Sequence, residues 1–223
     1  MGTTFPWQPT AARTVPETVC VNSGGDLHLY AAGFRKGAEA LLEVVRSIGH
    51  GQDLLVCPIV YSLRHSVELL LKQVTRAGRR LVDEPGDFPD GHRLDNLWST
   101  CRPVLKKIWP SDPSYAKVES VITRLCELDP KGESFHYPVS TRRQGVRATT
   151  LDPDLRHLDL GTLVSEVLEV IQLLNGAGTS IDACMDTKYD MEEEARAIER
   201  EMREDFEAQM RAEYADEMRS NYL

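Results

Sequence analysis

Apolar residues recur at spacings of three and four in five stretches of the chain, which is the period of an α-helix that packs along one side. Asp26 is placed to cap the first helix. The second is apolar around most of its circumference, which is typical of a central, buried helix. Pro103 should kink or split the third. The predicted helices span residues 26–47, 53–77, 93–109, 114–128 and 159–174.

Two segments interrupt this pattern. Residues 1–25 contain three prolines, which predicts an extended N-terminal arm. Residues 129–158 lose the helical period, and Phe135, Tyr137 and Val139 alternate with polar residues, so a short strand or hairpin is expected within an irregular insertion.

The end of the fifth helix is open at the level of sequence. Asn175-Gly176-Ala177-Gly178 either ends the helix or lets it pack closely against a neighbour and continue. Residues 190–223 hold twelve acidic residues and five arginines, a net charge of -7, and predict an acidic C-terminal helix. Its large apolar residues recur every four positions and wind around the helix, since each step advances by about 40°. They are Ile198, Met202, Phe206, Met210, Tyr214 and Met218.

The predicted fold class is therefore all-α: a bundle of about five helices over residues 26–189, with the insertion at 129–158, the arm at 1–25 and the acidic helix at 190–223. Of the 223 residues, 41% are hydrophobic and 27% are charged, so a sizeable core is expected. The net charge of -9 argues against a basic nucleic-acid coat protein.

Composition also bears on location and cofactors. The most apolar run, 54–71, contains Arg64, His65 and Glu68, so we expect no membrane span. The five cysteines form no CxxC pair, which predicts neither a disulfide framework nor a zinc site. The N-terminus lacks the apolar region of a signal peptide. We expect a cytoplasmic protein with no metal and no cofactor.

The best candidate site lies on the second helix. Tyr61, His65, Glu68 and Lys72 fall on one stripe at spacings of four, three and four, and Arg64 reaches Glu68 at i,i+4. Buried charges must pair with one another or face a cleft. Two interpretations remain open: a polar network that fixes the position of the helix, or an acid–base centre.

Further candidates lie outside this helix. His92 opens the third helix, where it either caps the helix or approaches the same cleft. Ser134, His136 and Tyr137 lie in the insertion, where functional groups are over-represented. Nearby cations form a local basic cluster that either grips phosphates or is simply solvated. They are Lys131, Arg142, Arg143 and Arg147.

Three patches together resemble bacterial HEPN-like proteins. They are Tyr61-Ser62-Leu63-Arg64-His65-Ser66-Val67-Glu68-Leu69-Leu70-Leu71-Lys72, then His92-Arg93-Leu94-Asp95-Asn96-Leu97-Trp98, and Asp129-Pro130 leading to Ser134-Phe135-His136-Tyr137-Pro138.

The resemblance implies an antiparallel helical bundle that often forms a homodimer. It also implies a setting in toxin–antitoxin or phage-defence systems, where many members cleave RNA without metal. The Arg and His separated by four to six residues that such members use are absent here.

The sequence thus leaves several functional hypotheses. The first is an HEPN-like protein that binds or cleaves nucleic acid, most simply RNA, with His65 or His136 as acid or base. The alternative is a non-catalytic sensor or partner-binding module of a multi-protein complex, with 190–223 as its interaction surface. A third is a small-molecule or nucleotide sensor that uses the cleft beside His65.

Overall fold

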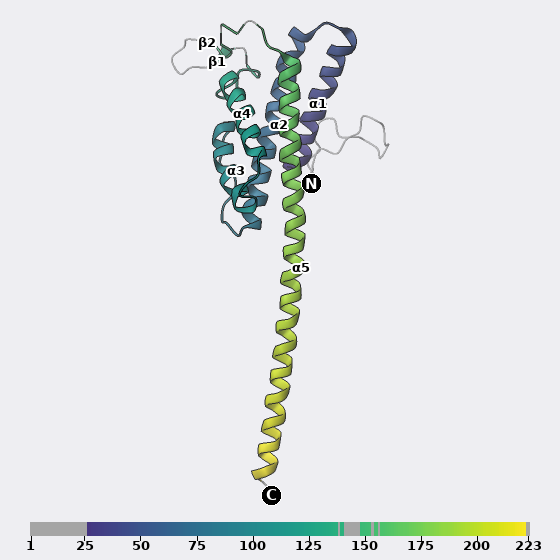
Figure 1. The fold of residues 1–223 in the computed structure, drawn as a ribbon, viewed down its shortest axis with the longest axis vertical. Coiled ribbons are helices and arrows are strands. Elements are labelled where there is room, and N and C mark those ends of the chain that lie inside the picture. Colours follow the sequence, from purple (N-terminus) through teal and green to yellow (C-terminus); the bar gives the residue numbers. More distant parts are fainter. Residues whose placement is uncertain (1–25, 138, 141–147, 153, 156, 222–223) are drawn as a thin grey trace, which may run out of the picture.

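The computed structural model describes residues 26–137, 139–140, 148–152, 154–155 and 157–221, so the predicted N-terminal arm lies outside the described residues. Within them the chain forms five helices and one very short strand pair (Figure 1). The elements are α1 (Leu27–Ile48), α2 (Gln52–Leu81), α3 (Leu94–Ile108), α4 (Ser114–Leu128), β1 (Val139–Ser140), β2 (Ala148–Thr149) and α5 (Leu160–Asn221).

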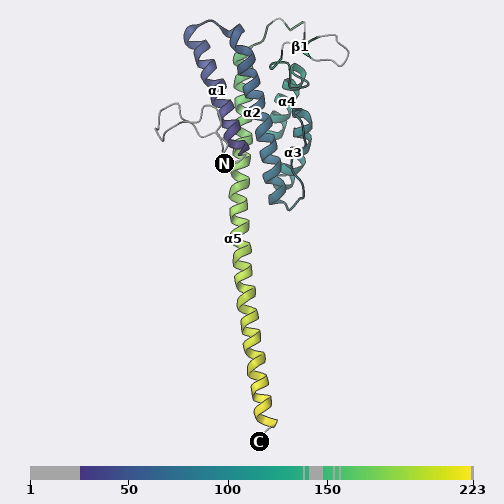
Figure 2. The ribbon, with the colours of Figure 1, turned by 180° about the vertical axis from the view of Figure 1, so that it is seen from behind.

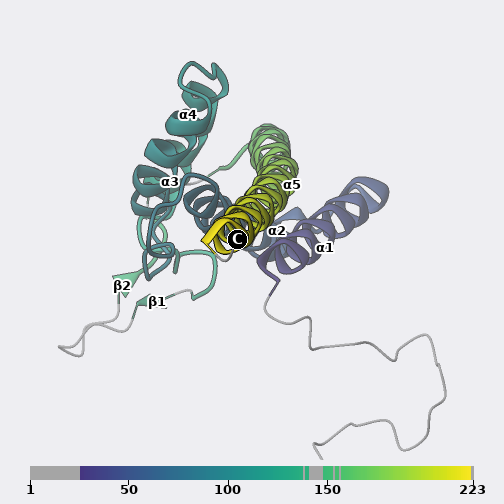
Figure 3. The same cartoon turned by 90° about the horizontal axis from the view of Figure 1, so that it is seen from below.

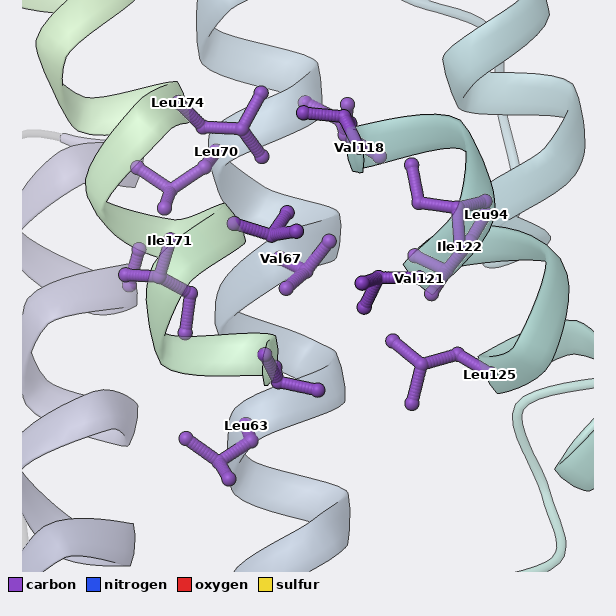
Figure 4. Close-up of a cluster of buried hydrophobic side chains, with 14 of the residues drawn as sticks. Leu63, Val67, Leu70, Leu94, Val118, Val121, Ile122, Leu125, Ile171 and Leu174 are labelled. Atoms are coloured by element: carbon purple, nitrogen blue, oxygen red, sulfur yellow. The ribbon is translucent and has the colours of Figure 1, made fainter. Parts of the chain in front are cut away.

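Helix α2 is the centre of the bundle. Seen from below, it lies between α1, α5 and the α3–α4 pair, so three sides of it are covered (Figure 3). This explains why its sequence is apolar almost all round. Figure 4 shows the core that results, with Leu63, Val67 and Leu70 of α2 facing side chains from α4 and α5.

Neighbouring helices along the chain run mostly antiparallel, as the views from the front and from behind show for α1 and α2 (Figures 1 and 2). Helix α5 instead runs beside α2 in the same direction. Two contacts show this: Gly178 lies next to Val74, and further along both helices Lys188 Nζ lies 3.2 Å from the carbonyl oxygen of Leu81. The predicted all-α antiparallel helical bundle of five helices is confirmed.

Local signals explain the helix starts. The Asp26 side chain accepts hydrogen bonds from the backbone N–H groups of His28 and Leu29, so the predicted N-cap of α1 is confirmed. Gly49 and Gly51, both with positive φ, form the tight turn between α1 and α2.

Neither of the two candidate helix breakers in the sequence splits or ends its helix. Pro103 lies inside α3 without dividing it into two helices, because the buried Cys101, Val104 and Leu105 hold that helix against the core. Asn175-Gly176-Ala177-Gly178 does not end α5. Packing on α2 continues across the glycines, because the flanking Leu174 and Ile181 are both buried.

The insertion begins with an irregular turn and continues into the two-residue antiparallel pair β1–β2, in which Val139 is opposite Thr149. The hairpin expected from alternation is present, although Phe135 and Tyr137 precede it rather than belong to it. Ser134 Oγ donates to the carbonyl of Thr150 at 2.9 Å and ties the two ends of the hairpin together.

Two helices, α2 and α5, contain a segment long and apolar enough to cross a membrane by length and composition alone. In α2, 56% of that segment is buried inside the body, and in α5 28% is. The core helix of a bundle passes the same test because its apolar residues contact other helices.

Candidate functional site

The carboxylate of Glu68, in the middle of α2, is the centre of a cluster of ionisable groups. Its side chain is only 2% exposed. One oxygen, Oε1, lies 2.8 Å from Lys72 Nζ and 2.8 Å from Nδ1 of His92. The other, Oε2, lies 3.5 Å from Nδ1 of His65 and 3.8 Å from Nη1 of Arg64. His65 and Lys72 of the predicted stripe and the adjacent Arg64 therefore meet at the Glu68 carboxylate, together with His92, whereas Tyr61 of the stripe does not contact it.

Glu68 stays ionised under ordinary conditions. Burial alone would raise its pKa, but hydrogen bonds from His65, Lys72 and His92, together with the charge of Lys72, lower the pKa from 4.5 to about 2. The group is thus a permanent negative charge in a nearly dry environment. Such a charge orders the donors around it strongly.

His92 reaches Glu68 because the loop after α2 doubles back along that helix. The Asp87 carboxylate binds Arg76 through Nε and Nη2, each at 2.8 Å. The ring of Phe88 then lies under two cations, 4.7 Å from Arg76 Cζ and 5.5 Å from Lys72 Nζ. The loop therefore retraces α2 towards its N-terminus and brings His92 to Glu68.

Arg64 holds the surrounding loops in place and is itself buried. Its Nη2 donates to the carbonyl oxygen of His92 at 2.9 Å, which fixes the backbone that carries this histidine. Its Nε lies 3.4 Å from Oδ2 of Asp129, a second buried carboxylate, whose Oδ1 accepts the N–H groups of Glu133 and Ser134 at 3.0 Å each. Arg64 thus connects the start of α3 to the start of the insertion.

Gly132 makes this packing possible. Its φ is +77°, and a Cβ at this position would lie 2.7 Å from Nη1 of Arg64. Any other residue would both strain the backbone and displace the guanidinium.

A row of aromatic rings leads from the cluster to the surface. His65 stacks parallel to Tyr61, with ring centroids 5.8 Å apart, and Tyr61 contacts His136 at 4.8 Å. His136 stacks on Tyr137 at 4.2 Å, and Tyr137 is 55% exposed. Phe34 of α1 packs edge-on against His65 at 4.5 Å and supports the row from behind.

The structure brings together most of the residues singled out in the sequence. Arg64, His65, Glu68, Lys72 and His92 form the cluster. His136 joins through the aromatic row and not through the carboxylate. Lys131 is exposed in the turn beside Gly132. Arg142, Arg143 and Arg147 lie outside the described residues.

Sequence reasoning missed the role of Asp129. In the sequence, Asp129-Pro130-Lys131-Gly132 indicates only a local turn. That the aspartate is buried against Arg64 depends on contacts 65 positions apart in the chain. The sequence does contain a glycine three residues after Asp129, and this glycine fits the positive φ of Gly132. It does not indicate that Arg64 lies against the turn.

The geometry favours proton transfer at His92. Glu68 is ionised and can only accept, so Nδ1 of His92 carries the hydrogen, and in the neutral form of the ring Nε2 has a lone pair. The His92 side chain is 69% exposed, so this ring is accessible to a substrate. A buried carboxylate that orients an accessible imidazole is the arrangement of a general base.

Within the described residues, no group of three or more His, Cys, Asp or Glu side chains is arranged to hold a metal ion. The chain gives no match to family models, to curated proteins or to solved structures.

Proposed function

We propose that this protein is an HEPN-like, cytoplasmic RNA-binding protein that cleaves single-stranded RNA without a metal ion. The observation that carries the proposal is the buried, ionised Glu68 that holds Nδ1 of the exposed His92 at 2.8 Å. The three patches that resemble HEPN-like proteins add a toxin–antitoxin or phage-defence setting to the proposal. Every residue of the Glu68 cluster belongs to one of the first two patches, and Asp129, which lies against Arg64, opens the third.

The reaction needs a base and an acid but no metal. Nε2 of His92 takes the proton of a ribose 2′-hydroxyl, and the 2′-oxygen then attacks the adjacent phosphorus. The bond to the 5′-oxygen breaks, and this oxygen receives a proton from a second imidazole. We assign this role to His65, whose Nδ1 lies 3.5 Å from the same carboxylate. The products are a 2′,3′-cyclic phosphate and a 5′-hydroxyl.

The charges of the cluster set a limit on phosphate binding. Arg64 and Lys72 are balanced by Glu68 and Asp129, so these four groups carry no net charge. The charge of the phosphate must then be met by protonated histidine or by exposed cations such as Lys131.

The aromatic row supports single-stranded RNA as the substrate. The exposed ring of Tyr137 is backed by His136, and together they present a stacking surface next to the cluster. Unpaired bases stack on such rings, whereas bases inside a duplex are not accessible to them.

The test is cleavage and binding of single-stranded RNA in the presence of EDTA. His92→Ala should lower the cleavage rate by about 10²- to 10⁴-fold, the usual contribution of a general base. His50→Ala is the matched control, because His50 is exposed in the turn between α1 and α2, outside the cluster. Equal rates for the two variants would contradict the role of His92.

Binding is tested separately from cleavage. Tyr137→Ala should weaken single-stranded RNA binding by about 5- to 150-fold, since stacking one base contributes about 1–3 kcal/mol. Tyr189→Ala, at an exposed tyrosine of α5, is the control and should change nothing. Tyr137→Phe should bind like the wild type, because stacking does not need the hydroxyl. Binding that is insensitive to Tyr137 would exclude the aromatic row as the RNA site.

A further inference from the structure

An open groove lies between the end of α3, the start of α4 and the stretch of α5 around Gly176. Its volume is about 410 Å³, which is within the range of small-molecule binding sites. His92 of the Glu68 cluster precedes α3, whereas Trp109 of the groove follows it, so the two regions are at opposite ends of this helix. A helix of this length separates them by about 20 Å.

Three aromatic side chains line this groove. Trp98 and Tyr115 are buried, with ring centroids 6.2 Å apart, and Trp109 is half-buried. The hydroxyl of Tyr115 donates to the carbonyl oxygen of Trp109 at 2.8 Å, so the end of α3 is tied to the first turn of α4. The aromatic lining is therefore formed in the absence of a ligand. The faces of such rings are electron-rich and attract cations.

Asp112 supplies the charge of this groove. Its Oδ1 accepts the backbone N–H of Ser114 at 2.8 Å, and Oδ2 has no hydrogen-bond or ion-pair partner among the described residues. The described residues that line the groove include no lysine or arginine. Burial and the negative charge of Asp112 both raise the pKa of the Tyr115 phenol, so this charge acts on the wall of the groove. An unbalanced carboxylate beside aromatic rings is complementary to a cation.

Gly176 leaves space on the α5 side of the groove. It lies inside the helix, and a Cβ at this position would meet no atom within 4 Å. Glycine is unfavourable inside a helix, and no close contact with the body requires it here. The space beside it is large enough for methyl groups of a ligand.

We propose that this groove binds a small organic ammonium ion, such as a methylated amine. The ammonium group lies against the aromatic rings and near Oδ2 of Asp112, and its methyl groups occupy the space beside Gly176. A bare metal cation is less suited, because most of the lining is apolar and cannot replace its hydration shell. This inference is independent of the proposed RNA chemistry, and its failure would leave that proposal intact.

The test is isothermal titration calorimetry of the full chain with choline as the probe. We expect a dissociation constant between about 10 μM and 1 mM, as is reasonable for a ligand of this size. The neutral alcohol 3,3-dimethylbutan-1-ol has the same shape without the charge, and it should bind at least about tenfold more weakly. No heat of binding at about 10 mM choline, or equal affinity for the neutral alcohol, would overturn the proposal. Sedimentation with phosphatidylcholine vesicles, without binding of free choline, would assign the groove to a membrane lipid and would overturn it as well.

Two variants locate the site. Asp112→Asn keeps an oxygen that can accept the N–H of Ser114, and it should weaken choline binding about 5- to 30-fold because the charge is lost. Asp53→Asn, in the exposed first turn of α2, is the matched control and should change nothing. Gly176→Leu should abolish measurable binding without lowering the urea midpoint, whereas Gly33→Leu adds the same side chain to open space on α1 and should bind like wild type. Choline binding that is unchanged in Asp112→Asn or in Gly176→Leu would exclude this groove as the site.

Discussion

Replacing Glu68 with glutamine tests the electrostatics of the cluster, because it removes the charge and keeps the size. The pKa of Glu68 falls from 4.5 to about 2 in the folded protein. A tenfold change in proton affinity is worth about 1.4 kcal/mol, so the ionised carboxylate contributes about 3 kcal/mol to the free energy of unfolding above pH 4.5. Because the folded-state pKa is the lower one, this contribution disappears as the pH falls towards 2.

The assay is urea unfolding of wild type and Glu68→Gln at pH 5 and at pH 3. Wild type should be the more stable at pH 5, and its advantage should shrink by about 2 kcal/mol at pH 3. Carboxylates elsewhere, such as Asp87 and Asp95, have lowered pKa values through their arginine partners, and their effects cancel in the comparison. An advantage that is the same at both pH values would refute the view that Glu68 is held ionised by its neighbours.

Two further predictions concern the body of the bundle. Gly78→Ala should destabilise the protein by about 1–3 kcal/mol, because the new Cβ would lie 2.8 Å from Cγ1 of Val104. Gly176→Ala meets no atom within 4 Å and should instead stabilise α5 by about 0.5–1 kcal/mol. Urea unfolding midpoints that move in the same direction for both variants would contradict this packing. Iodoacetamide should modify the exposed Cys184 long before Cys101, because burial raises the pKa of the Cys101 thiol to about 12. Mass spectrometry of a time course measures both rates, and equal rates would mean that Cys101 lies at the surface.

Much of the architecture could be predicted from residue spacing. The apolar circumference of α2 identified the central helix, and spacings of three and four placed His65, Glu68 and Lys72 on one stripe of it, with Arg64 beside that stripe. These are local properties, since an α-helix fixes the direction of each side chain from its position in the chain.

The remaining features depend on contacts between distant residues. His92 meets Glu68 only because Asp87 and Phe88 hold the loop against α2. The residues of the loop do not by themselves predict that it turns back along this helix. The glycines of α5 left open whether the helix ends or continues, and the burial of Ile181 against the core explains why it continues. Tertiary packing outweighs local propensity in such cases.

The most direct test of the proposed function is the chemistry of the RNA ends produced by the purified full chain in EDTA. Transfer to the 2′-oxygen predicts 2′,3′-cyclic phosphate and 5′-hydroxyl ends by mass spectrometry. It also predicts that a substrate with a single ribonucleotide in a DNA strand is cut only after that nucleotide. Intact RNA, or products with 3′-hydroxyl and 5′-phosphate ends, would contradict an acid–base centre built on Glu68 and His92.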